Sequence, residues 1–381
     1  MASYKTRMRL LCDMLSYARP AGSDTDNAFR ERFLMTLPGA YVDSCRNIHV
    51  EVGDGTSRAL FSSHTDTATR SEGRQTVHLD NVGVLHLSRK STRAGAVLGA
   101  DDTAGIFVMC EMIRAGVSGH YIFHYGEEIG GIGSSEIAED MPEWLRSRFD
   151  MAVAFDRRGY TDVITRQSGG DCCSSTFARA LSDALNRYVG SGGIVFAFAP
   201  CDGGIFTDTA NYIDDVPECT NLSVGYFREH STHETLDTRF LFSLSDTLQR
   251  IDWASLPIAR DPVAARAQRM ADMIDLRRRW ALAYSAQQNM RDALAVARAQ
   301  VGPSYAFVDD AHDETLYEID EDDEDDDTLD DEDNHCAYLD PQWEQIQRAL
   351  RNAEIIERRQ READRIESAK RRQPSVLVGR F

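Results

Sequence analysis

The sequence predicts an α/β fold, in which a mostly parallel mixed sheet is covered by helices on both faces and followed by a helical C-terminal extension. Two observations lead to this prediction. Through residues 1–256, short apolar runs of strand length alternate with apolar residues at helical spacing. Polar residues with catalytic chemistry stand just after several of these runs, where α/β proteins gather their active sites. The 381 residues suffice for a sizeable core and for more than one domain.

Turn residues divide the first part of the chain into its expected elements. Buried strands are expected at 59–63, 121–125, 151–155, 194–198 and 222–226. Helices are expected at 102–115, from about residue 134, at 174–188 and at 243–253. Gly116 marks the end of the first of these helices. Because helices alternate with the strands, neighbouring strands are expected to run mostly parallel.

The chain changes character near Pro262, after which no strand pattern occurs. Further on, apolar residues follow 3-4 spacing over about three heptads, as in a coiled coil or a helical hairpin. The stripe suits packing within one chain as well as an oligomer seam. We predict four regions: an α/β domain at 1–258, a helical segment with a coiled-coil pattern at 259–308, an acidic disordered linker at 309–340, and a charged C-terminal helix and tail at 341–381.

The net charge of −20 belongs mainly to one segment. Residues 309–334 contain 17 Asp and Glu and no Lys or Arg, which leaves −3 for the rest of the chain once they are taken from the total. Such a block is expected to be disordered, as a solvated spacer or as a docking surface for basic partners. The rest of the chain has no long basic stripe, which argues against nucleic acid as a partner.

The eight cysteines show no CxxC pair and no compact disulfide framework. The vicinal pair Cys172 and Cys173 is more typical of small packing residues than of a reactive site. The N-terminus lacks the apolar core of a signal peptide, and no apolar run is long enough to span a membrane. We therefore expect a cytoplasmic protein with reduced thiols and no membrane partner.

Five candidate metal ligands and a candidate base occur in order along the first 230 residues. They stand in short polar stretches: His64 in His-Thr-Asp, Asp101 in Gly-Ala-Asp-Asp-Thr-Ala-Gly, Glu127 and Glu128 in Gly-Glu-Glu-Ile-Gly-Gly, Asp156 in Ala-Phe-Asp, and His230 in Glu-His-Ser-Thr-His-Glu. Two imidazoles and three carboxylates suit a pair of zinc or similar divalent ions. Adjacent glutamates at a strand end point in different directions, so that Glu128 can bind metal while Glu127 serves as the base. The pattern predicts a two-metal hydrolase.

Simpler interpretations of the same residues remain open. Asp101 or Asp102 could be a helix N-cap, since Asp is favoured there, and we expect Asp102 to have that role. Glu127 and Glu128 could be a solvated pair. Two ligand choices compete with a neighbour: Asp156 with Asp162, and His230 with His233. The sequence contains no dinucleotide fingerprint, phosphate-binding P-loop or nucleophile elbow.

The five stretches, in this order, resemble the co-catalytic zinc aminopeptidase and carboxypeptidase superfamily, whose members share a phosphorylase/hydrolase-like α/β fold. The resemblance covers roughly residues 1–256 and none of the tail. It implies that Asp101 bridges two zinc ions. It also implies that His64 and Asp156 complete one site, and that Glu128 and His230 complete the other.

The resemblance assigns two supporting roles as well. Asp66 would hold the His64 ring through its remaining N–H, which fixes the tautomer. Glu127 would be the general base and then the acid. The peptide bond between Asp101 and Asp102 would be cis, as it often is in the superfamily.

The interval from Asp156 to His230 spans 74 positions, which the core strands and helices need. Its shortness favours the single-domain aminopeptidase branch over carboxypeptidase-like relatives with an inserted domain. We therefore expect a zinc aminopeptidase, with Co²⁺ or Mn²⁺ as other suitable ions, in which a metal-bridged hydroxide generated by Glu127 attacks an amide carbonyl. The alternatives are an N-acyl small-molecule amidohydrolase and a non-catalytic scaffold that works through its tail. Expected partners are a peptide or small amide substrate and, through the C-terminal helices, a second copy or another protein.

Overall fold

The computed structural model describes residues 3–190 and 193–301, and the chain divides into two units. The first unit is Met1–Leu276, and the second begins at Arg277. The predicted acidic linker at 309–340 and the charged helix at 341–381 lie outside the described residues.

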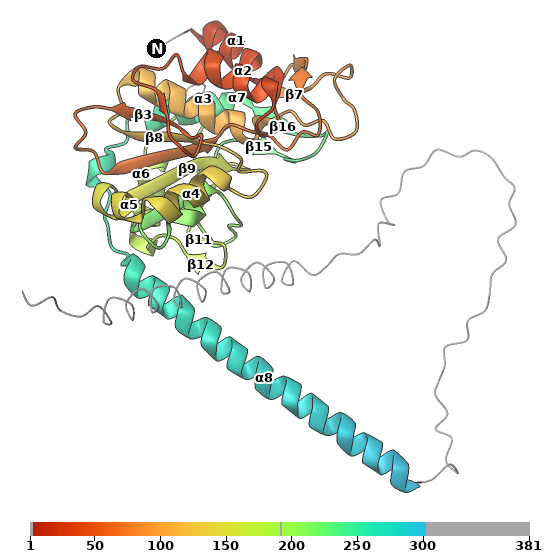
Figure 1. Cartoon of the computed structure of the whole chain (residues 1–381). Coiled ribbons are helices and arrows are strands. Elements are labelled where there is room, and N and C mark those ends of the chain that lie inside the picture. The colour runs from red at the N-terminus through yellow and green to blue at the C-terminus, as the bar shows by residue number, and fades with distance from the viewer. Residues whose placement is uncertain (1–2, 191–192, 302–381) are drawn as a thin grey trace, which may run out of the picture. The chain divides into compact units, whose positions relative to one another are not determined.

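An eight-stranded mixed sheet forms the centre of the first unit (Figure 1). In order across the sheet its strands are β13 (Ala199–Cys201), β10 (Asp162–Ile164), β14 (Glu218–Ser223), β9 (Met151–Arg157), β4 (Ala59–His64), β8 (Gly119–His124), β3 (Ile48–Val52) and β2 (Tyr41–Val42). The four neighbours β14, β9, β4 and β8 are parallel. β10 pairs antiparallel with β14, β3 with β8, and β2 with β3. The predicted mixed sheet is confirmed, and its parallel centre directs four strand ends to one edge.

Helices cover both faces of this sheet (Figure 1). One face packs against α1 (Tyr4–Leu15), α3 (Ala100–Ala115), α6 (Ser175–Asn186) and α7 (Thr238–Leu248). The other face packs against α4 (Ile132–Asp140) and α5 (Pro142–Arg148). Successive residues of β8 alternate between the two cores, because Tyr121 and Phe123 join the first cluster and Ile122 joins the second. This alternation explains why the middle of the strand, from Tyr121 to Phe123, is continuously apolar.

Smaller elements surround the sheet. A four-stranded antiparallel sheet has the order β15 (Tyr226–Phe227), β16 (Thr235–Asp237), β7 (Val84–Leu87) and β6 (Val77–Leu79). Two-stranded sheets pair β1 (Tyr17–Ala18) with β5 (Gly73–Arg74), and β11 (Arg166–Gln167) with β12 (Gly170–Asp171). The remaining turns are helical: α2 (Asp24–Phe29), a π-turn at Arg30–Leu34, and 3-10 turns at Asp208–Tyr212 and Trp253–Ser255.

The prediction of a strand at 194–198 is wrong. Val195 forms only an isolated bridge with Val189, and β13 begins at Ala199. The backbone of Phe198 bonds instead to the side chain of Asn186. The Phe198 N–H donates to Asn186 Oδ1 at 2.8 Å, and the Phe198 carbonyl accepts from Asn186 Nδ2 at 2.8 Å. Phe196 and Phe198 are buried, so the apolar run anchors a loop rather than pairing in the sheet.

Two other predicted elements are shifted along the chain. β14 begins at Glu218 rather than at residue 222, because polar side chains at its start are buried through hydrogen bonds. The closing helix begins earlier than predicted, at Thr238, and ends at Leu248. Asp237 caps it by accepting from the N–H groups of Arg239 and Phe240 at 2.9 and 3.2 Å.

Gly105 sets how closely α3 approaches the sheet. A Cβ at this position would collide with the carbonyl oxygen of Phe155 and the hydroxyl of Ser63. We expect Gly105→Ala to lower the free energy of unfolding by roughly 1–3 kcal/mol, the usual cost of overpacking. An alanine that fitted without displacement would instead stabilise the helix by about 1 kcal/mol. Urea unfolding of both proteins measures the sign, and an unchanged or raised midpoint contradicts the close approach.

The C-terminal extension begins with α8 (Pro262–Val301), in the range where the sequence predicts a helix. Asp261 caps it by accepting from the N–H groups of Val263 and Ala264. Arg266 and Arg269, in the part that belongs to the first unit, both pair with Asp214. The coiled-coil character of the heptad stripe stays a prediction.

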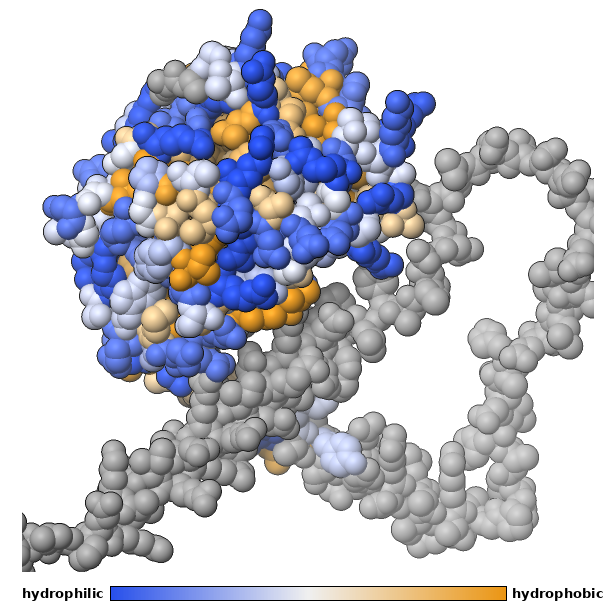
Figure 2. Space-filling view, turned by 45° about the horizontal axis from the view of Figure 1, so that its top comes forward, coloured by the Kyte–Doolittle hydropathy of each residue, from blue (hydrophilic) through white to orange (hydrophobic). Residues whose placement is uncertain are grey.

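Hydrophilic side chains cover most of the face of the first unit seen in Figure 2, with apolar side chains in small separate groups. Within the part of the chain that the structure describes, each helix is too short or too polar to cross a bilayer.

Candidate metal centre

The predicted site residues come together at one edge of the large sheet. β9, β4 and β8 are parallel neighbours, so their carboxyl ends meet there. The position of each residue follows from these elements: His64 ends β4, Asp101 lies at the start of α3, Glu127 and Glu128 follow β8, Asp156 lies near the end of β9, and His230 lies between β15 and β16.

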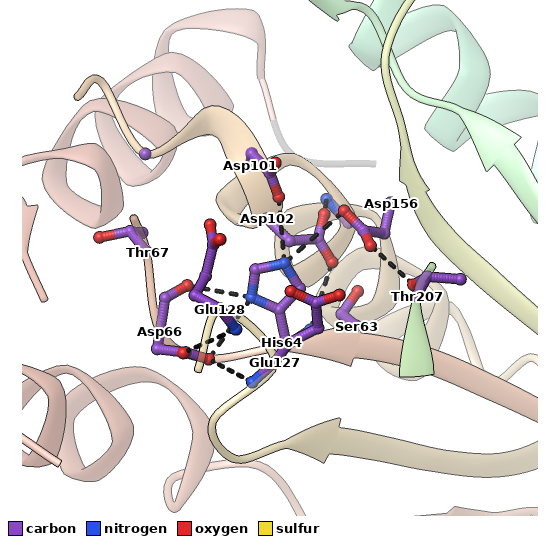
Figure 3. Close-up of polar contacts among 12 residues, drawn as sticks. Ser63, His64, Asp66, Thr67, Asp101, Asp102, Glu127, Glu128, Asp156 and Thr207 are labelled. Atoms are coloured by element: carbon purple, nitrogen blue, oxygen red, sulfur yellow. Dashed lines mark hydrogen bonds and ion pairs between the residues drawn. The ribbon is translucent and has the colours of Figure 1, made fainter. Parts of the chain in front are cut away.

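His64, Asp101 and Asp156 form the first group of candidate ligands (Figure 3). The Nε2 atom of His64 lies 3.0 Å from Asp101 Oδ1 and 3.6 Å from Asp156 Oδ1. One ligand atom from each of the three residues lies within 4.8 Å of the other two. An imidazole and two carboxylates in this arrangement suit zinc or a similar divalent ion.

Asp101, Glu128 and His230 form the second group. The Nε2 atom of His230 lies 3.2 Å from Asp101 Oδ2 and 3.1 Å from Glu128 Oε2. Asp101 therefore directs one carboxylate oxygen to each group and is the member they share. His230 has a φ of 61°, a left-handed conformation that is uncommon outside glycine and is frequent at functional sites.

The charges of the two groups call for cations. Within the two groups, the three carboxylates of Asp101, Glu128 and Asp156 face two imidazoles, and the carboxyl of Glu127 lies near them. Hydrogen bonds that the His230 ring donates to Asp101 and then to Glu128 raise the pKa of His230 to about 11. Burial and then the charge of Asp101 raise the pKa of Asp156 to about 6. Within the described residues, Glu128 Oε1 is buried without a hydrogen-bond partner. The donor set, the excess of negative charge and this unpaired oxygen all fit divalent ions.

Asp66 supports the centre differently from the prediction. The Nδ1 atom of His64 bonds to the backbone carbonyl of Asp66 at 3.0 Å, while the Asp66 carboxylate lies 3.6 Å away. That carboxylate accepts from the backbone N–H groups of Glu127 and Glu128, both at 3.1 Å (Figure 3). Because its oxygens are engaged by these two amides, Asp66 fixes the turn that presents both glutamates as well as the His64 ring.

Glu127 belongs to neither ligand group, and its side chain leaves the turn in a different direction from that of Glu128 (Figure 3). Burial raises the pKa of its carboxyl well above the usual value, and the nearby Asp156 and Asp208 raise it further. His64 acts in the opposite direction. A half-buried carboxyl beside the candidate ligands, and outside both groups, can accept and return a proton.

Asp156 is held by residues that the sequence analysis missed. Thr207 and Tyr226 donate hydroxyl hydrogen bonds to its carboxylate, at 2.7 and 3.1 Å. The Asn221 side chain accepts from the backbone N–H of Asp156 at 2.8 Å and donates to its carbonyl at 2.7 Å. No motif marks these three residues as partners of Asp156, so only the fold reveals their contacts.

Glu234 joins the His230 loop to the start of α3. Its buried carboxylate accepts from the N–H groups of Gly99 and Asp101, at 2.8 and 2.9 Å. Burial raises the pKa of Glu234 to about 8.

Asp102 has the capping role expected of it. Its carboxylate accepts from the Gly105 N–H at 3.0 Å and also from the His64 N–H at 3.3 Å. The peptide bond between Asp101 and Asp102 is cis, as the resemblance implies.

Arg19 places a buried positive charge beneath the acidic centre, and the sequence analysis missed it as well. Its guanidinium donates to Thr103 Oγ1 at 2.8 Å and lies over the Phe29 ring at 4.1 Å. Burial lowers the pKa of Arg19 to about 10, while attraction to Asp26 and Asp66 opposes that shift. The guanidinium thus offsets part of the negative charge of Asp66 and Asp102, which lie beside the ligand residues in the chain.

His230, and not His233, meets the other candidate ligands. Among the described residues, His233 belongs to neither group, and its backbone N–H donates to Ser231 Oγ at 3.2 Å. We expect His230→Ala to lower the metal content of the purified protein, because it removes one of three ligands from the second group. His233→Ala is the matched control and should leave the metal content unchanged. Equal losses in the two variants, measured by plasma mass spectrometry, would contradict the choice of His230.

A cavity of about 610 Å³ lies beside the second ligand group and is lined by Glu128 and His230. This volume falls in the ordinary range for small-molecule and peptide-residue sites. A substrate bound in the cavity would have part of its backbone next to the candidate metal ligands.

A scan against protein-family profiles and a search of curated proteins each found no match to the sequence. Three of the similar solved structures are peptidases by name. Aminopeptidase PepT from Bacillus cereus is 14% identical, with a TM-score of 0.49 and coverage of 65% of this chain and 97% of that chain. A tripeptidase from Staphylococcus aureus is 13% identical, with a TM-score of 0.48, and the match covers 65% of this chain and 97% of that chain. A TET aminopeptidase from a marine sediment archaeon of the Thaumarchaeota is 12% identical, with a TM-score of 0.47 and coverage of 69% and 99%.

All three matches are under 25% identical and have TM-scores under 0.5. At such identities and TM-scores they carry no argument about activity. The function proposed below therefore rests on the geometry of the site.

Proposed function

We propose that this protein is a two-zinc metallohydrolase that cleaves peptide or amide bonds, with aminopeptidase action as the first choice. The observation that carries the proposal is the pair of ligand groups that share Asp101. His64 and Asp156 would complete one ion site, and Glu128 and His230 would complete the other. A carboxylate with one oxygen directed to each group is what a pair of neighbouring divalent ions requires.

Divalent ions bound there would lower the pKa of a water molecule and polarise the carbonyl of the scissile amide. The side chains of the protein supply the rest of the chemistry. Glu127 would accept a proton from the attacking water and transfer it to the nitrogen of the leaving amine, so that an amide and water give a carboxylic acid and an amine. Asp66 supports this transfer, because it fixes the backbone of Glu127 and Glu128 together.

A peptide-library cleavage screen tests the proposal. The full chain would be incubated with added zinc, cobalt or manganese, and with a chelator as the control. We expect cleavage that depends on metal and about two ions per chain. A stable, metal-free protein that cleaves no peptide would contradict the proposal and favour a non-catalytic scaffold. Cleavage of N-acyl amino acids but not of peptides would favour the small-molecule amidohydrolase.

A further inference from the structure

The wall of the cavity beside Glu128 and His230 is built mainly from small and hydroxyl-bearing residues. Ala21, Ala96, Thr67, Thr69 and Thr232 are among the lining residues, and the hydroxyls of Thr67 and Thr69 donate to backbone carbonyls. Small side chains leave space for a substrate side chain or terminus, and hydroxyl groups can bond to its polar atoms. The lining therefore leaves room for a substrate group beside the second ligand group.

Arg70 is the one Arg or Lys side chain among the described residues that line this cavity. The segment that carries it is anchored, because the Arg70 N–H donates to the Gly95 carbonyl at 2.9 Å. The aliphatic part of Arg70 lies directly over Gly95, where an added Cβ would come within 2.6 Å of Arg70 Cδ. Glycine at this position therefore lets the Arg70 side chain lie across the 93–96 loop in the cavity wall.

The charge of Arg70 is available to a ligand. Arg157 and Arg158, which follow Asp156, pair with Asp162 at 3.0 Å and with Glu229 at 3.1 Å. Arg70 is exposed, and in the described part of the chain it forms no ion pair with a carboxylate. An unpaired guanidinium in a cavity wall is suited to a carboxylate, which it can bind through two parallel hydrogen bonds.

We infer that the preferred substrates carry a carboxylate close to the scissile amide, and that Arg70 is the residue that recognises it. The inference rests on the proposed hydrolase function. With the amide at the ligand groups, the substrate residue in the cavity directs its carboxylate to Arg70. That carboxylate belongs either to the side chain of an N-terminal Glu or Asp, or to the free C-terminus of a short peptide. The chemistry recognised is the same in both cases.

Replacing Arg70 should lower the affinity for the substrate more than it lowers the rate of the chemical step. A hydrogen bond to a charged group corresponds to a change of about ten- to hundredfold in affinity. We expect Arg70→Met to raise KM for carboxylate-bearing substrates by about that factor and to leave kcat nearly unchanged. Arg70→Lys keeps the charge but loses the two-pronged geometry, so its KM should lie between those of the other two proteins. Arg93→Met, which removes an exposed arginine of the neighbouring loop that does not line the cavity, is the control.

The experiment uses the zinc-loaded full chain and matched peptides. Glu-Ala-Ala against Gln-Ala-Ala tests a side-chain carboxylate, and Gln-Ala-Ala against its C-terminal amide tests a terminal carboxylate. We expect the wild type to prefer one charged member of a pair, and Arg70→Met to abolish that preference while cleaving the neutral peptide normally. Raised salt should weaken the preference, because the guanidinium is exposed. Equal KM values for all the peptides in the wild type, or a preference that survives Arg70→Met, would overturn the inference.

The same peptides separate this inference from the proposed function. If no peptide is cleaved at any metal, the hydrolase proposal fails, and the intact peptides are then titrated calorimetrically into the wild type and Arg70→Met. Tighter binding of a charged peptide to the wild type alone would support the carboxylate site on its own. Equal binding would exclude it.

Discussion

Glu127→Gln should retain its metal ions and lose at least about 10²-fold of its turnover, the usual scale for loss of a general acid–base group. The amide of glutamine has nearly the shape of the carboxylate but cannot accept a proton from water. Glu127 belongs to neither ligand group, so its replacement should leave both groups intact. Metal content by plasma mass spectrometry and kcat on a cleaved peptide are the two measurements.

Glu128→Gln is the matched control, because it changes the adjacent residue in the same turn. Its carboxylate belongs to the second ligand group, so this variant should lose metal as well as turnover. Normal turnover in Glu127→Gln would exclude Glu127 as the base. Metal loss in Glu127→Gln equal to that in Glu128→Gln would mean that Glu127 is a ligand.

The second large effect is expected from Asp101→Ala, which should lower metal occupancy in both groups and reduce thermal stability. Asp101 is the shared member, with Oδ1 toward His64 and Oδ2 toward His230. A bound ion stabilises the folded state by about 2.7 kcal/mol when its free concentration is 100 times the dissociation constant. Without the shared carboxylate, most of that stabilisation should disappear for both ions. Thermal unfolding with and without chelator, together with metal content, measures the effect.

Asp156→Ala is the control for this variant, since Asp156 belongs to the first group alone. It should lose about one ion per chain, whereas Asp101→Ala should lose about two. Unchanged zinc stoichiometry in Asp101→Ala would contradict the shared role. So would a chelator-induced fall in melting temperature as large as that of the wild type.

The sequence was informative where chemistry and secondary structure coincide. His64, Asp101 and Asp156 could be selected because each follows an apolar run or begins a helix, and parallel strands bring such positions together. Arg19 and Thr207 could not be selected, because their contacts depend on segments brought close only by the fold. The loop at 194–198 was mistaken for a strand for a related reason. Its aromatic side chains are buried, but its backbone bonds to a side chain rather than to a neighbouring strand.

The hydrogen bond between Glu234 and the Asp101 N–H joins residues that are 133 positions apart. The ligand groups likewise combine residues from β4, α3, the turn after β8, β9 and the loop before β16. Contacts between residues so far apart in sequence are expected to form late in folding, because long loops must close before they can be made. Ions held by these residues would therefore slow unfolding while leaving the folding rate nearly unchanged. In this protein, bound metal would therefore extend the lifetime of the folded state and would not start its folding.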